Sequence, residues 1–542
     1  MCVAALACAG KPENPVTLAI VNGRVWTGDE AKPWAEAIAI EGDRIVAVGT
    51  TAEIKALVGQ TRTIDAAGGM VAPGFIDSHV HFPAGGFALA SVQLRDAASK
   101  QEFIARIKKY AGTVEKGAWI TRGDWDHTNW GGELPTREWI DSVTPDNPVW
   151  INRLDGHMNL ANSAALKLAG VDASTRDVAG GAIVRDASNN PTGVLKDNAM
   201  SLVDRVRPPQ PDAEWDRGVE AAMAYVAARG ITSVHDMDGW DAIRAYRRLQ
   251  VAGRLHTRIM AAVPLSDWRV LADTIGRAGR GDAMLRIGRL KGFVDGSLGS
   301  HTAAMIAPFT DAPRDSGFFV TPAESLFAWT KSADSAGLQV AVHAIGDRAI
   351  RTQLDIFERV ARENGARDRR FRIEHAQHIA QDDITRFGII GVIASMQPYH
   401  AVDDGRWAEA VIGPARAQGT YAFRALLDAR ATLAFGSDWF VAPPTPLEGI
   451  QAAVTRRTLD GKNPDGWVPS QKITVEEALR AYTSGAAYAG FQDKEVGRIT
   501  TGRLADIVIL DRDLTKIPPE TIGQTVVKFT IVNGVVVFEK KK

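Results

Sequence analysis

Cysteine is almost absent from this 542-residue chain. Its two cysteines, Cys2 and Cys8, both fall within the first ten residues. A body without thiols can contain neither a structural disulfide nor a cysteine-ligated metal. Any metal ion must therefore be bound by histidine, carboxylates or a modified lysine.

The chain also lacks an excess of charge of either sign. It has 63 lysines and arginines against 64 aspartates and glutamates, which gives a formal net charge of −1. Nucleic acids attract proteins that carry a positive field or a clustered basic surface. We therefore expect no nucleic-acid partner.

Long apolar runs are missing as well, and no stretch approaches the ~20 residues that a membrane span requires. The first ten residues are small and apolar and turn polar at Lys11, which is similar to the end of a secretory or lipoprotein signal without its basic front. Residues 1–14 have two interpretations: a leader that directs the chain to the periplasm or to a lipid anchor in the envelope, or the disordered N-terminus of a cytoplasmic protein.

Both chain ends contain short β-strand patterns. Asn22-Gly23 and Asn533-Gly534 each separate two apolar runs, and this dipeptide predicts a hairpin because both turn residues need positive φ. Neither end is large enough to bury a core alone. We therefore predict that residues 15–70 and 491–542 form the two halves of one composite β-sandwich.

Between the ends, apolar β-rich runs alternate with amphipathic helical patterns, as in a parallel sheet with crossover helices. We predict an α/β protein with a (β/α)8 TIM barrel over residues 71–490. After the first run comes a gap of about 150 residues, far longer than a βα loop, which predicts an inserted subdomain at about 95–215. The eight predicted barrel strands are residues 71–77, 232–235, 258–263, 290–294, 338–343, 371–375, 392–396 and 432–437.

Polar residues gather at the carboxyl ends of these strands, where the loops of a TIM barrel share one mouth. His79 and His81 are two residues apart, so on a strand both imidazoles point the same way and can bind one metal ion. The alternative is a pair of histidines on a solvent-facing strand. Four further candidates lie within or after later strands: Lys291, His343, His375 and Asp438.

Four imidazoles, one carboxylate and one lysine can hold two divalent ions, and nitrogen-rich ligation favours Zn²⁺. A lysine fits beside cations only when it is deprotonated, which burial and nearby cations both favour. Reaction of Lys291 with CO2 would then give a carbamate with two oxygens to bridge the ions. The alternative is an ordinary lysine that pairs with Asp295.

At these residues the chain resembles the amidohydrolase superfamily, and within it the YtcJ-like, amidohydrolase-3 group that includes N-substituted formamide deformylases. The resemblance runs from about residue 16 to the C-terminus. The segments that carry it are Pro73–His81, Lys291–Thr302, Val342–Arg348, Arg372–Gln377 and Phe435–Trp439, with Arg153–His157 and Asn162–Leu166 in the insertion.

The resemblance implies a β-sandwich around a metal-bearing barrel. It places His79, His81, Lys291 and Asp438 on one ion, and Lys291, His343 and His375 on the other. It also implies a CO2-derived carbamate on Lys291.

The expected chemistry is hydrolysis of a C–N bond in a small amide, formamide or cyclic amide by a metal-activated water. Asp438 is the expected general base. His157, followed by His235, is the candidate donor to the tetrahedral oxyanion, and the alternative for each is a histidine satisfied by the surrounding structure.

Other functions stay open at this point. Ester or lactone hydrolysis, or deamination, would use the same water, and a barrel that has lost catalysis would serve as an amidohydrolase-like binding protein. The expected partner is a small molecule. Homo-oligomers are common for such folds, although no stretch of the sequence identifies an interface.

Overall fold

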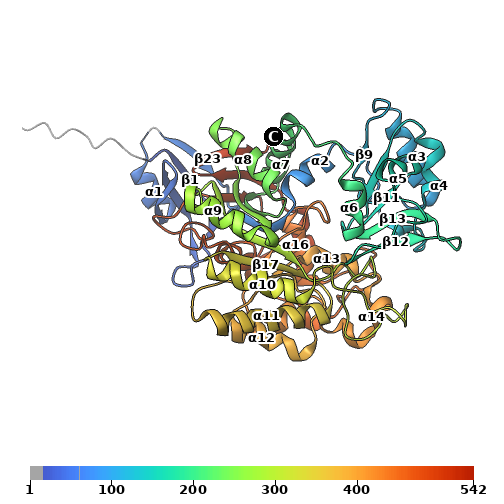
Figure 1. Ribbon diagram of the computed structural model, residues 1–542. Helices are drawn as coiled ribbons and strands as arrows, with labels where there is room; N and C mark the ends of the chain where they lie inside the picture. The colour runs from blue at the N-terminus through green and yellow to red at the C-terminus, as the bar shows by residue number, and fades with distance from the viewer. Residues whose placement is uncertain (1–15, 60, 542) are drawn as a thin grey trace, which may run out of the picture.

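The computed structural model describes residues 16–59 and 61–541, so the predicted leader at 1–14 lies outside the described residues. At its centre is an eight-stranded parallel sheet (Figure 1). In spatial order the strands are β20 (Leu433–Phe435), β19 (Ile393–Met396), β18 (Arg372–His375), β17 (Gln339–Ala344), β16 (Leu285–Phe293), β15 (Arg258–Pro264), β14 (Ile231–Asp236) and β8 (Phe75–Val80).

The two edges of this sheet meet at their carboxyl ends. Val80 and Trp439 form a parallel bridge. The Asp438 amide donates to the His79 carbonyl and the His81 amide donates to the Trp439 carbonyl, both at 2.7 Å. These bonds join β8 to the segment after β20 and nearly close the sheet, which confirms the predicted TIM barrel.

Amphipathic helices cover the outside of the barrel. In α11 (Asp347–Asn364), Ile350, Leu354 and Phe357 are buried at a spacing that places them on one helical face. Helices α10 (Ala323–Ser335) and α12 (Ile384–Ile390) flank α11 in Figure 1. The apolar stripe of each helix packs on the strands, so the polar strand ends stay open at the barrel mouth.

The first predicted barrel strand, residues 71–77, is in fact two strands. Its first part belongs to β7 (Met70–Pro73), which pairs in the sandwich, and its second part to β8, which pairs with β14. The chain changes sheet at Gly74, where a Cβ would collide with the Thr232 side chain. A residue without a side chain is therefore needed at this passage.

The sandwich is built from both chain ends. One sheet has the order β5-β4-β1-β6 and the other β23-β22-β21-β7-β2-β3. Ile20, Ile38, Ile507 and Ile531 are buried in their shared core. The strands other than β7 are β1 (Leu18–Val21), β2 (Arg24–Trp26), β3 (Trp34–Ala35), β4 (Ala37–Glu41), β5 (Arg44–Gly49), β6 (Arg62–Asp65), β21 (Ile507–Leu510), β22 (Val527–Val532) and β23 (Val535–Glu539).

Of the two predicted Asn-Gly hairpins, one forms. Asn533 and Gly534 have φ of 53° and 73° and join the antiparallel pair β22 and β23. The prediction of a hairpin at Asn22-Gly23 is wrong. The strands on either side do not pair with each other, because β1 pairs with β4 and β6 whereas β2 pairs with β3 and β7. Gly23 lies close to Val71, where a Cβ would be 2.8 Å from Cγ2, so this dipeptide carries the chain from one sheet to the other.

A separate five-stranded sheet, in the order β12-β13-β11-β10-β9, lies between β8 and β14 in the sequence and beside the barrel in Figure 1. Trp125, Ile151 and Leu160 belong to its own buried core. Its strands are β9 (Ile120–Thr121), β10 (Val149–Asn152), β11 (Met158–Ala161), β12 (Gly181–Arg185) and β13 (Pro191–Asp197). The loop from β10 to β11 reaches the barrel mouth, where the Ser300 hydroxyl donates to Asp155 at 2.8 Å.

No helix in the described part of the chain has both the length and the apolar character needed to cross a bilayer.

Candidate metal centre and pocket

Two histidines lie at the end of β8, and a carboxylate fixes the orientation of each imidazole ring. The Nδ1 atom of His79 lies 2.6 Å from the Glu374 carboxylate, and that of His81 lies 2.7 Å from Asp238. A carboxylate acceptor holds the proton on Nδ1 and leaves Nε2 free to bind a metal. Both Nε2 atoms approach the same oxygen of Asp438, at 3.4 and 3.6 Å.

Two further histidines come from the ends of β17 and β18. Nε2 of His343 lies 3.0 Å from the Gly296 carbonyl, and Nδ1 of His375 lies 2.9 Å from the Gln397 side-chain oxygen. The His375 ring centroid is 4.6 Å from that of His343 and 4.8 Å from that of His79. Each imidazole therefore donates through one nitrogen to a protein acceptor and has the other available as a ligand.

Lys291, near the carboxyl end of β16, is buried against these rings, with Nζ 3.2 Å from Nε2 of His79. Burial lowers the pKa of Lys291 to about 8. The alternative partner, Asp295, instead accepts backbone N–H groups from Ala304, Ile345 and Gly346. No ion pair between Lys291 and Asp295 forms in the described structure.

The charge states of the cluster suit a metal. Burial lowers the pKa of His79, His343 and His375 well below the usual value, so their imidazoles are neutral. Ligand atoms of His79, His375 and Asp438 lie within 4.8 Å of one another. Neutral imidazoles with one carboxylate are the donors that Zn²⁺ and similar divalent ions prefer, so the residues present fit such an ion.

His157 reaches this cluster from the insertion. Its ring centroid lies 4.8 Å from that of His343, and its Nδ1 lies 2.7 Å from Asp197. Burial alone would lower the pKa of His157, but the hydrogen bond and the charge of Asp197, together with the charge of Asp155, raise it above the usual value. His157 therefore presents an N–H donor with cationic character to the pocket.

The structure does not bring His235 to the pocket. Its side chain is fully buried inside the barrel, with Nδ1 3.0 Å from an Arg372 nitrogen. A Cβ at Gly490 would lie 2.6 Å from its other ring nitrogen. His235 occupies the layer of the barrel interior that contains Arg372, out of reach of a molecule at the mouth.

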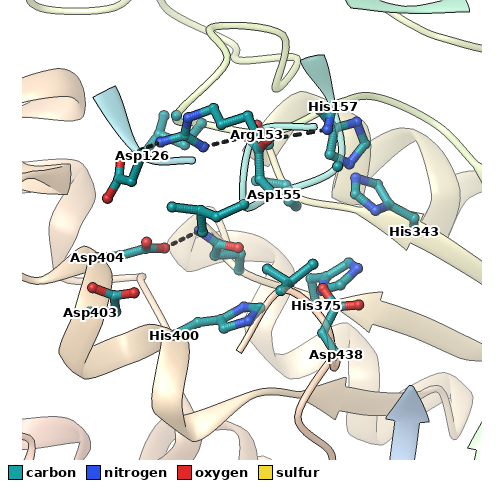
Figure 2. Close-up of a pocket in the computed structure, with 18 of the residues that line it drawn as sticks. Asp126, Arg153, Asp155, His157, His343, His375, His400, Asp403, Asp404 and Asp438 are labelled. Carbon is teal, nitrogen blue, oxygen red and sulfur yellow. Dashed lines mark hydrogen bonds and ion pairs between the residues drawn. The ribbon is translucent and has the colours of Figure 1, made fainter. Parts of the chain in front are cut away.

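A cavity of about 180 Å³ opens above the cluster (Figure 2). His81, Lys291, His343, His375 and Asp438 form part of its wall, together with His157. The remaining wall combines apolar with charged and polar side chains, so a small molecule can bury apolar surface there while one group reaches the metal ligands. The apolar lining residues are Leu154, Phe293, Leu298, Ile345, Trp407, Phe440 and Val441.

Comparison with known proteins identifies the chain's relatives. The model of the amidohydrolase family matches residues 62–538. The chain belongs to the amidohydrolase family. This amidohydrolase also matches, over residues 37–57, a model of the imidazolonepropionase-like composite domain of bacteria, which here falls in the sandwich.

Three curated relatives align with most of this amidohydrolase. It is 41% identical to Protein LONG AFTER FAR-RED 3 of Arabidopsis thaliana, over 91% of this chain and 87% of that protein. Putative amidohydrolase YtcJ of Bacillus subtilis is 31% identical, with 96% and 99% covered. The N-substituted formamide deformylase of Arthrobacter pascens is 30% identical, with 96% and 98% covered. The predicted resemblance to the YtcJ-like group is confirmed.

Among solved structures, an uncharacterized metal-dependent hydrolase from Pyrococcus horikoshii superposes with a TM-score of 0.76 at 29% identity. The match covers 93% of this amidohydrolase and 99% of that chain. Family membership and this neighbour support hydrolase activity that depends on a divalent metal.

Some pocket residues of the amidohydrolase carry no clear sequence signal. Gln377 lines the same cavity as His375, but β18 ends at His375, and the positive φ of His375 and Ala376 breaks the strand alternation that could have indicated it. His400, Asp403 and Asp404 lie on α13 (Pro398–Asp404), directly after β19. Their place on a mouth-side segment was the available signal, but a histidine or aspartate in a helix indicates no role by itself.

Proposed function

We propose that this protein hydrolyses a C–N bond in a small amide, formamide or cyclic amide, using two divalent ions, Zn²⁺ by preference. One observation carries the proposal: four imidazoles, each oriented by an acceptor on one nitrogen, lie around Asp438 and Lys291 at the floor of a small cavity. The name of the Arthrobacter pascens relative, N-substituted formamide deformylase, supports a formamide among the substrates.

The ligands divide into two sets that share Lys291. His79, His81 and Asp438 would hold one ion, and His343 and His375 the other. Burial lowers the pKa of Lys291 to about 8, so about one-tenth of its amine is neutral at pH 7 and can react with CO2. The carbamate would add a negative charge and two oxygens between the two sets. Bound there, the ions would supply a water of lowered pKa and polarise the substrate carbonyl.

Asp438 acts as the general base of this scheme. Burial raises its pKa to about 6, a value suited to accepting a proton at neutral pH and releasing it in the next step. The carboxylate lines the cavity, so it can take a proton from the attacking water and pass it to the departing nitrogen. The C–N bond then breaks, with a carboxylic acid and an amine as products.

His157 stabilises the tetrahedral intermediate. Its Nδ1 is held by Asp197, so the opposite N–H is the donor available for the oxyanion. Because Asp197 lies in the insertion, docking of that subdomain on the barrel places the donor.

We expect His157→Ala to lower kcat by a factor of about 10² to 10³, the usual cost of removing one donor to an oxyanion. The metal content should not change, because His157 is outside the ligand set. Steady-state kinetics on a formamide substrate, with metal analysis of the same sample, checks this. His301→Ala is the matched control, because His301 pairs with Asp311 outside the pocket. A loss no greater than that of the control would remove His157 from the mechanism.

The function itself is tested by a hydrolysis screen on metal-replete protein. Formamides, acyl amides, cyclic amides, esters, lactones and amino-heterocycles are incubated in parallel, and the amine, acid or ammonia released is measured. The proposal expects amides or formamides to be hydrolysed and the activity to disappear with a chelator. Turnover confined to lactones or to deamination would replace the proposed reaction.

A further inference from the structure

The side-chain amide of Gln377 has a fixed orientation beside the metal cluster. Its Nε2 donates to Asp404 at 2.8 Å and lies 3.2 Å from Nε2 of His378. The other ring nitrogen of His378 is 2.9 Å from the Thr420 hydroxyl, and burial lowers the pKa of His378 to about 3, so this imidazole is neutral and accepts from Gln377. Both amide hydrogens are thus in use, which leaves the Oε1 atom as the free group.

The free Oε1 belongs to a residue that lines the cavity and is only 4% exposed. Its Oε1 accepts no hydrogen bond from the described part of the chain. Because Gln377 lines the cavity, this oxygen is an acceptor open to a ligand that supplies an N–H or O–H there.

Asp404 places a negative charge next to this acceptor. One of its oxygens accepts from Gln377 and from the Tyr421 hydroxyl. No arginine, lysine or histidine nitrogen forms an ion pair with Asp404 among residues 16–59 and 61–541. Burial raises the pKa of Asp404 to about 7, although the hydrogen bond from Tyr421 and the charges of Arg153 and Arg406 oppose the rise.

The two arginines nearest in charge to Asp404 form their ion pairs with other carboxylates. Arg406 pairs with Asp403 and lies 3.8 Å from Asp126. Arg153 pairs with Asp155 at 2.6 Å and with Asp126 at 3.4 Å. Asp126, Asp155 and Asp403 are the direct ion-pair partners of these two arginines, so within the described residues the Asp404 carboxyl has no cation in contact. A cationic group that enters the cavity would favour its ionised form.

We propose that Gln377 and Asp404 bind a cationic N–H group of the substrate, such as a primary ammonium. The substrates would be small amides that carry an amine at the end remote from the scissile bond. In Figure 2, Asp404 lies across the pocket from His157 and His343, so one molecule can place its carbonyl at the metal ligands and its ammonium at Asp404. This inference rests on the proposed hydrolysis and specifies its substrate class.

The test compares three formamides of equal length on the metal-replete protein: N-(4-aminobutyl)formamide, its uncharged isostere N-pentylformamide and the anionic N-formyl-4-aminobutanoate. We expect kcat/KM for the cationic compound to exceed that for the neutral one by about ten- to a hundredfold, as for a charge-assisted hydrogen bond, and the anionic compound to be the poorest. Equal rates for the cationic and neutral compounds would overturn the inference and leave the proposed hydrolysis intact.

A variant without the negative charge tests whether Asp404 causes the preference for the cationic substrate. Asp404→Asn should lower the cation-to-neutral ratio of kcat/KM by at least about tenfold, because a neutral amide keeps the shape without the charge. The exposed Asp382 provides the matched control, and Asp382→Asn should keep the native ratio. An unchanged ratio in Asp404→Asn would refute the assignment.

If none of the three compounds is hydrolysed, the proposed reaction fails for formamides, and calorimetric binding of the same compounds to the native protein decides the inference. Tighter binding of the cationic compound would support the ammonium site. Equal binding of the cationic and neutral compounds would refute it.

Discussion

Replacement of Asp438 by asparagine is expected to lower kcat by a factor of about 10³ to 10⁴, near the upper end of what a general base contributes. Asparagine keeps the size of the side chain but cannot accept a proton. Asp438 is also within 3.4 and 3.6 Å of the free nitrogens of His79 and His81, so the change weakens one metal position as well. The measurement is kcat at saturating substrate and saturating metal, which separates the lost base from the lost ligand.

The pH profile gives a second signature of Asp438. In the native protein, activity should fall as the pH drops through about 6 or somewhat below. Without metal ions, burial raises the pKa of this carboxyl to about 6 against the lowering effect of His81, Lys291 and His157, and bound ions would lower it further. The protonated form can neither accept a proton nor bind an ion. The asparagine variant should lack this acidic limb. A variant that retains more than about one-tenth of the native kcat would refute the assigned role.

Replacement of Glu374 by glutamine is expected to lower the free energy of unfolding by about 3–5 kcal/mol, the cost of breaking a buried ion pair from one side. Glu374 is fully buried and accepts from two nitrogens of Arg372, at 2.7 and 3.0 Å. Loss of its charge leaves the Arg372 guanidinium buried without a counterion. Because Glu374 also orients His79, metal affinity should fall about 10- to 100-fold.

Denaturant unfolding of the metal-free protein and a competition titration with a metal indicator measure the two effects. Glu358→Gln is the matched control, because Glu358 is a partly exposed carboxylate that pairs with Arg386 at 3.0 Å. Such surface pairs contribute about 0–1 kcal/mol. If the two variants unfold alike and bind metal alike, the Arg372, Glu374 and His79 network does not support the site.

The barrel and the positions of its metal ligands could be predicted because both show as local patterns in the sequence. Each strand is a short apolar run between helical patterns, and the polar residue that ends it stands out, as His343 and His375 do. The carboxyl ends of parallel barrel strands lie at one mouth, so polar residues at the ends of different strands are expected to share one site. The distances among His79, His375 and Asp438 then followed from closure of the sheet.

Other features depend on contacts that the sequence does not show. Asn22-Gly23 has the local signal of a hairpin, yet the pairing partners of β1 and β2 decide that it links two sheets. The division of one apolar run at Gly74 likewise depends on Thr232, which is distant in the sequence.

The roles of some pocket residues could not be predicted from the sequence, because they too depend on contacts with distant segments. Gln377 shows its free oxygen only once His378 and Asp404 are known to occupy its amide hydrogens. His157 could be named from the resemblance, whereas its position beside His343 depends on docking of the insertion through contacts such as that of Asp155 with Ser300. His235 ends a strand run as the metal ligands do, but its ring lies against Arg372 in the barrel interior.

A metal titration of the metal-free enzyme tests the central claim most directly. Zn²⁺ is added stepwise to chelator-treated protein while release of amine from a formamide substrate is followed. The proposed site predicts no hydrolysis without metal and activity that rises to a plateau at about two ions per chain. Hydrolysis that persists in the metal-free protein, or a folded protein that binds no divalent ion, would contradict it.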